Sequence, residues 1–72
     1  MMEWEIAACL GEDDWHALGS ADGSSPVAAL RSWTGRHGRE HERYGVRSPG
    51  ADVWQPFVFD AMGEPEASDV ID

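Results

Sequence analysis

The chain has 72 residues, enough for one small domain, and it is acidic: 14 Asp and Glu stand against five basic residues, for a formal net charge of −9. A domain of this size seldom encloses a deep pocket, and strong acidity opposes nonspecific binding to nucleic acids and anionic membranes. The composition therefore disfavours an enzyme. The only cysteine is Cys9, which excludes an intrachain disulfide.

The composition also predicts where the protein works. No apolar run approaches membrane-spanning length, and the first residues are acidic where a signal peptide would be basic. We therefore expect a cytoplasmic protein with no membrane contact and no cofactor. All five basic residues are Arg. The lack of Lys indicates a GC-rich coding bias, such as that of a bacterium or its phage.

The N-terminal part of the chain predicts a β-hairpin. Residues 3–10 alternate, with Ile6 and Ala8 on the side expected to face a core and Glu3 and Glu5 on the side expected to face water. An acidic turn follows, and residues 14–19 form a second short strand.

One helix is expected after a loop at residues 19–25. Ser25 suits an N-cap and Pro26 suits the first turn. Apolar side chains then follow helical spacing, and Gly35 is the expected stop. The predicted helix therefore covers residues 26–34.

Two further strands are expected in the C-terminal half, at about residues 43–48 and 53–60, with a Ser-Pro-Gly-Ala-Asp turn between them. Pro56 lacks a backbone donor, so it predicts an edge strand or a bulge. The segment from Met62 onward is acidic and low in core residues, which is typical of a disordered tail.

The order β-β-α-β-β predicts an α+β fold: a four-stranded antiparallel sheet with one helix packed on one face. Residues 1–61 are expected to form a single domain, and residues 62–72 a flexible acidic tail. Val70 and Ile71 are the apolar exception within that tail.

The face of the sheet without a helix is predicted to carry Leu18, Trp54 and Val58, together with Ala7 and Cys9. A sheet face that meets water is normally polar, so these residues indicate a surface that something covers. Leu18, Trp54 and Val58 are the predicted partner-binding residues, and a second copy of the chain is one candidate partner. The alternative is that the fourth strand twists at Pro56 and both faces pack internally.

All five Arg lie between Arg31 and Arg47, so one basic segment separates two acidic ends. Arginine forks match phosphates and nearby aromatic rings stack on bases, so this segment is the basis of an alternative hypothesis, nucleic-acid binding. Its residues are Arg36, Arg39, Arg43 and Arg47. The opposing interpretation is that these side chains offset neighbouring carboxylates within the fold.

A second alternative is a small metal-binding protein that uses Cys9, His16, His37 and His41. The chain has no Cys-x-x-Cys or His-Glu-x-x-His pattern, so no metal ligand is assigned. Catalysis by Asp13, Asp14 or His16 with a serine at 20, 24 or 25 has no supporting motif either, and no catalytic residue is assigned.

The sequence favours a small, non-enzymatic protein-interaction or regulatory module. An acidic inhibitor or adaptor fits the charge, because acidity steers a protein toward a basic partner.

Overall fold

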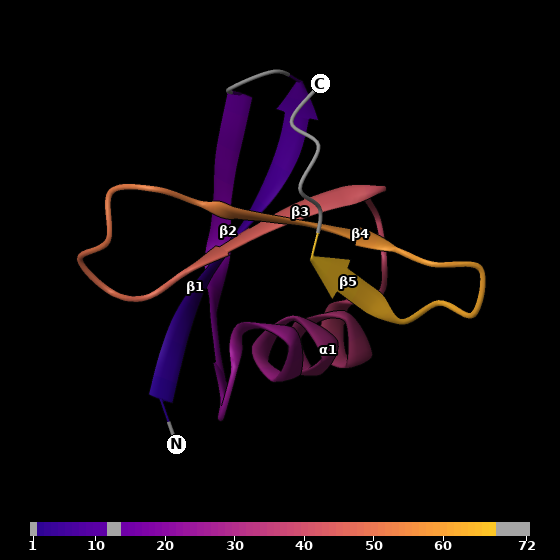
Figure 1. The fold of residues 1–72 in the computed structure, drawn as a ribbon, viewed down its shortest axis with the longest axis horizontal. Coiled ribbons are helices and arrows are strands. Elements are labelled where there is room, and N and C mark those ends of the chain that lie inside the picture. Colours follow the sequence, from indigo (N-terminus) through magenta and orange to yellow (C-terminus); the bar gives the residue numbers. More distant parts are fainter. Residues whose placement is uncertain (1, 12–13, 68–72) are drawn as a thin grey trace.

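The computed structural model describes residues 2–11 and 14–67, and it shows one α-helix on one face of a five-stranded antiparallel sheet (Figure 1). The elements in chain order are β1 (Met2–Gly11), β2 (Asp14–Gly23), α1 (Pro26–His37), β3 (Arg43–Arg47), β4 (Gln55–Phe59) and β5 (Pro65–Ala67). The strand order is β2-β1-β3-β4-β5. The predicted α+β class with one helix is confirmed, but the predicted count of four strands is wrong.

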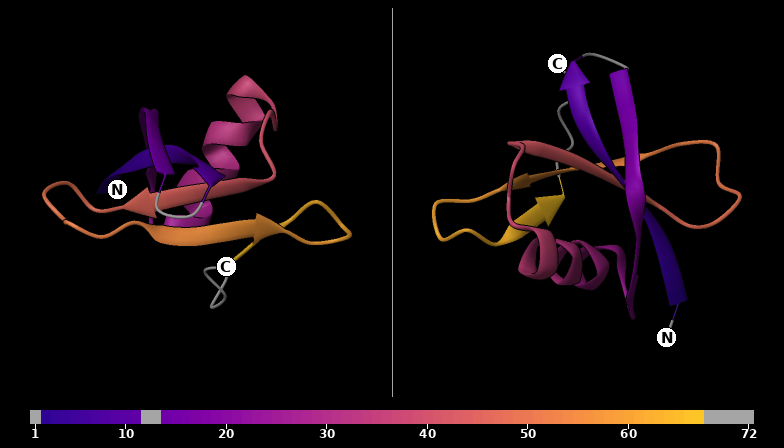
Figure 2. Two further views of the ribbon diagram at one scale, coloured as in Figure 1. Left: turned by 90° about the horizontal axis from the view of Figure 1, so that it is seen from above. Right: turned by 180° about the vertical axis from the view of Figure 1, so that it is seen from behind.

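The hairpin of β1 and β2 is longer than its pattern predicted and is interrupted by a bulge. Ile6 lies opposite Gly19, whereas Ala7 lies opposite Ala17, so Leu18 is an extra residue in β2. Such a residue breaks the alternation of side chains and increases local twist. Figures 1 and 2 show the hairpin running across the direction of β3 and β4. β2 continues to Gly23, although a loop was expected from residue 19.

The helix begins as predicted and ends later. The Ser25 side chain accepts a hydrogen bond from the Ala28 amide at 3.2 Å, and Pro26 is the first helical residue. The predicted stop at Gly35 is wrong. A helical Gly costs only about 1 kcal/mol, and α1 continues to His37. It ends where Gly38 adopts a φ of 81° and its amide donates to the Thr34 carbonyl at 2.9 Å.

The core lies between α1 and the sheet face that it covers, which we call the inner face. The buried side chains of this core are Ile6, Ala21, Ala29, Leu30, Tyr44, Val46 and Phe57. Two glycines of β2 let the helix come close, since the edge of the Trp33 ring covers Gly19 and the helix backbone at Ala29 lies against Gly23. A side chain at either glycine would occupy space that α1 already fills.

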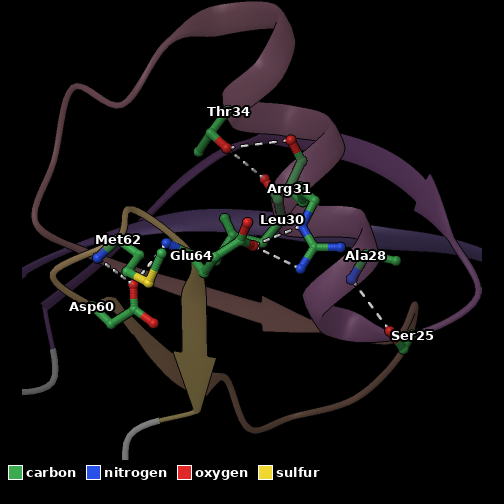
Figure 3. A network of polar contacts seen from close by, with 8 residues as sticks. All are labelled: Ser25, Ala28, Leu30, Arg31, Thr34, Asp60, Met62 and Glu64. Atoms are coloured by element: carbon green, nitrogen blue, oxygen red, sulfur yellow. Dashed lines mark hydrogen bonds and ion pairs between the residues drawn. The ribbon is translucent and has the colours of Figure 1, made fainter.

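The fifth strand corrects the predicted start of the tail. Asp60 turns the chain, because one carboxylate oxygen, Oδ1, accepts hydrogen bonds from the amides of Met62 and Glu64 at 2.9 Å each (Figure 3). Glu64 then pairs with Arg31 of α1 at 2.8 Å, and Pro65 is buried at the start of β5. A local turn at Asp60 and a long-range ion pair with α1 therefore accompany a strand in a segment whose composition predicted disorder. The remaining predicted tail, with Val70 and Ile71, lies outside the described residues.

The close approach of α1 to β2 predicts opposite effects for two glycine substitutions. We expect Gly23→Ala to lower the free energy of unfolding by about 1–3 kcal/mol, because its methyl group would overlap the backbone of Ala28 and Ala29. Gly35→Ala is the matched control. No atom lies within 4 Å of a methyl group there, and Ala is the better helix former by about 1 kcal/mol. Urea unfolding measures the stability of both variants, and equal stabilities would contradict the close packing of α1 on Gly23.

Candidate functional site

The sheet face opposite α1, which we call the outer face, holds two tryptophans in contact. The Trp15 ring of β2 lies flat on Gly45 of β3, at a position where no side chain would fit. The Trp54 ring stacks on Trp15, with ring centroids 6.1 Å apart and an interplanar angle of 25°. Both tryptophans are half-buried. The outer face therefore covers part of its own apolar surface and leaves part accessible.

Arg47 also contacts Trp54. Its guanidinium carbon lies 4.1 Å from the Trp54 ring centroid, a cation–π contact. The same guanidinium donates to both carboxylate oxygens of Glu5, at 3.2 and 3.3 Å. Trp54 is thus in contact with both Trp15 and Arg47, and Glu5 orients the Arg. We call Trp15, Trp54 and Arg47 the aromatic stack.

Acidic side chains stand on the outer face at the same end of β1 as Glu5. Glu3 lies directly opposite Asp22 in the β1–β2 pair, and both residues are exposed. Ser20 donates a hydrogen bond to the Glu3 carboxylate at 3.2 Å. Two like charges directly opposite each other disfavour strand pairing. This end of the outer face therefore carries unbalanced negative charge, because the nearby Arg47 already pairs with Glu5.

The structure separates the three predicted partner-binding residues. Trp54 belongs to the aromatic stack, and Val58 lies four residues further along the chain, in β4 opposite Arg43, on the outer face. Leu18 instead packs against the core cluster on the inner face. Leu18 lies on the side of β2 opposite Trp15, and because Trp15 packs on Gly45 of the outer face, Leu18 faces the core.

The structure also divides the four arginines of the nucleic-acid hypothesis. Arg47 is held in the aromatic stack, and Arg36 is exposed near the end of α1. Arg39 and Arg43 line one hollow of about 340 Å³, where Arg39 lies 5.0 Å from the centroid of the Phe59 ring. Acidic residues share that hollow, namely Glu42 and Asp60. The four guanidiniums therefore form no continuous basic track.

The candidate metal ligands have other surroundings. Cys9 donates to the Gly11 carbonyl at 3.2 Å, and the His37 ring packs on Trp33 with centroids 4.0 Å apart. Cys9 and His41 line a common hollow of about 440 Å³, together with Glu40, Glu42 and Arg43. Within residues 2–11 and 14–67, no three His, Cys, Asp or Glu side chains are grouped to hold a metal ion.

The serines considered as nucleophiles have structural contacts. Ser25 caps α1, and Ser20 donates to Glu3. Asp14 and His16 are exposed on β2, and Asp13 lies outside the described residues. Ser24 is exposed, and within residues 2–11 and 14–67 no hydrogen bond joins Ser20, Ser24 or Ser25 to a histidine.

Sequence reasoning missed Trp15, Gly45 and Glu5 as parts of the site. Trp15 lies far from Trp54 in the chain, and the two meet only because β1 and β3 are neighbours in the sheet. One signal was present. A glycine inside a strand often marks the close approach of another group, and Gly45 is such a residue.

Comparison with known protein families, with curated proteins and with solved structures gives no match. Among the described residues, no helix is long and apolar enough to cross a membrane. The geometry of the outer face is therefore the feature of the fold that bears on function.

The aromatic stack predicts that Arg47 contributes more to stability than Arg31. We expect Arg47→Gln to lower the free energy of unfolding by about 1 kcal/mol and to increase quenching of tryptophan fluorescence by acrylamide, since one side of Trp54 becomes open.

Arg31→Gln removes an ion pair whose side chains are 61% and 55% exposed. It should change stability by less than about 0.5 kcal/mol and leave quenching unchanged. Equal quenching in the two variants would show that Arg47 does not shield Trp54.

Proposed function

We propose that this chain is a non-enzymatic protein-interaction module that binds a protein partner through the outer face of its sheet. The observation that supports the proposal is Trp54, a half-buried indole in contact with Trp15 and Arg47 on the face that α1 leaves uncovered. The cytoplasm remains the proposed place of action.

The residue types of this site suit protein binding. Trp and Arg are the side chains most enriched among residues that dominate binding energy at protein interfaces. A side chain already held in one orientation loses less conformational freedom when a partner arrives. The contacts of Trp54 with Trp15 and Arg47 supply that order before binding.

The charge of the chain supports a basic partner. Glu3 and Asp22 stand exposed on the same face of the sheet as the aromatic stack, within a chain of net charge −9. Complementary charge speeds association and selects among partners. An acidic inhibitor or adaptor that covers a basic protein surface fits this combination.

Nucleic-acid binding stays the second candidate, supported by the hollow in which Arg39 and Arg43 lie beside Phe59. Arginine and an aromatic ring together suit a phosphate and a base. The carboxylates of Glu42 and Asp60 in the same hollow oppose a polyanion, which is why we favour a protein partner.

The proposal predicts that partner binding depends on Trp54. We expect Trp54→Ala to weaken binding by about thirtyfold or more, as for residues that dominate an interface, and Val58→Ala to weaken it less. Affinity capture from the native cells, with quantitative mass spectrometry, should show proteins that are retained by the natural chain and lost with Trp54→Ala.

Met62→Ala is the matched control, because Met62 is 88% exposed and lies away from the aromatic stack. It should retain the same proteins, and thermal unfolding should show that Trp54→Ala remains folded. Identical captured proteins for both variants would contradict the proposed site. Salt-sensitive binding to labelled RNA or DNA that Arg39→Ala and Arg43→Ala abolish would favour the second candidate.

A second copy of the chain is the other proposed partner of the outer face. If the face joins two copies, sedimentation at high protein concentration should give a dimer, and Trp54→Ala should give a monomer. A monomer of the natural chain would leave a different protein as the occupant.

A further inference from the structure

We propose that an extended, basic segment of the protein partner adds to the sheet as a further strand along the unpaired edge of β2. This inference rests on the proposed function and specifies how the partner binds. Adding a strand to a sheet edge is a common mode of peptide recognition, in which backbone hydrogen bonds provide affinity and side chains provide specificity.

The two edges of the sheet differ in protection. β5 forms one edge, has three residues and begins with Pro65, so it offers little backbone for pairing. β2 forms the other edge, has ten residues and contains no proline. Short strands, prolines and bulges are among the usual protections of an edge against further pairing. Of these three, β2 has only the bulge at Leu18. Within the described residues, β2 pairs only with β1.

The side chains of β2 leave its backbone accessible. Ala17, Gly19 and Ser20 are small and exposed, and His16 beside them is exposed as well. Buried residues begin at Ala21, where α1 packs against the end of the strand. The accessible part of the edge is therefore residues 14–20, slightly longer than an ordinary strand of roughly 5–6 residues, and the exposed side chain of Asp22 lies just beyond it.

Charge indicates which segment fits this edge. β2 carries Asp14 and Asp22 but neither Arg nor Lys, and Glu3 stands beside it on β1. Opposite charges on facing strands favour pairing, and like charges oppose it. A second copy of this acidic chain would bring further carboxylates, whereas a segment with Arg or Lys would offset those present.

The edge is continuous with the proposed binding face. Trp15 lies within β2 and its ring contacts Trp54 on the outer face. In an added strand, every second side chain would point to that same face, and one of them would lie opposite Trp15. A partner segment on this edge can therefore reach Trp15 and the acidic residues of β2, while Trp54 and Arg47 lie beyond β1, where the rest of the partner would contact them.

A synthetic peptide of four Arg-Val repeats is the probe for this proposal, and hydrogen exchange of the full chain followed by NMR is the measurement. At saturating peptide, we expect alternate backbone amides within residues 14–20 to exchange at least about tenfold more slowly, because they gain hydrogen bonds. The control peptide replaces each Val by Pro, keeps the charge and cannot pair. No slowing with the first peptide, or equal slowing with both, would overturn the proposal.

Charge variants test the specificity of the edge. We expect Asp14→Asn with Asp22→Asn to weaken binding of the Arg-Val peptide by about threefold to tenfold, as two lost cross-strand charge pairs imply. Asp52→Asn with Glu66→Gln changes the net charge equally, at exposed positions outside β2, and should change the affinity less than twofold. Equal weakening by both pairs would overturn the proposal. If the captured partner nevertheless depends on Trp54, the proposed function would hold, and only the strand addition would be wrong.

Discussion

The contact between the Trp15 ring and the backbone of Gly45 is the constraint on which the outer face depends. Trp15 reaches across β1 to lie on β3, and this position makes it the surface on which Trp54 stacks. Arg47 then packs on Trp54 and pairs with Glu5. Each side chain in this series holds the next one. A side chain at position 45 would lift Trp15 and loosen the whole series.

The inner face is built on the same physical rule, with glycine used for close approach. Gly19 admits the Trp33 ring, and Gly23 admits the backbone of α1. A domain of 72 residues has few large side chains with which to exclude water. Bringing the helix and a tryptophan directly onto the sheet backbone buries area without requiring more residues. On each face of this sheet, a tryptophan ring therefore packs directly on the backbone of a glycine.

Local chemistry was predictable from the sequence, and long-range contacts were not. Ser25 and Pro26 define the start of α1, and the capping hydrogen bond joins residues only three apart in the chain. Their local pattern was therefore sufficient to predict where the helix begins. Alternation along β4 placed Trp54 and Val58 on one face. The side of Leu18 depended on which face Trp15 occupies, and that follows from the contact of Trp15 with Gly45 of β3, which no local pattern encodes. The fifth strand depended on the Asp60 turn and on Arg31, whose partner Glu64 is 33 residues away.

The carboxylates of this small domain differ in their contacts: some are bound within the fold, and others are exposed. Glu5, Asp60 and Glu64 each hold a specific contact within the fold. Glu3 accepts a hydrogen bond from Ser20 but also faces Asp22, an arrangement of like charges that costs stability when no cation lies between them. Folding alone gives no reason for this pair, since an uncharged residue at either position would pair better. A basic side chain from a partner would turn the repulsion into a favourable contact, so the feature least useful to the isolated fold is the one that best fits binding.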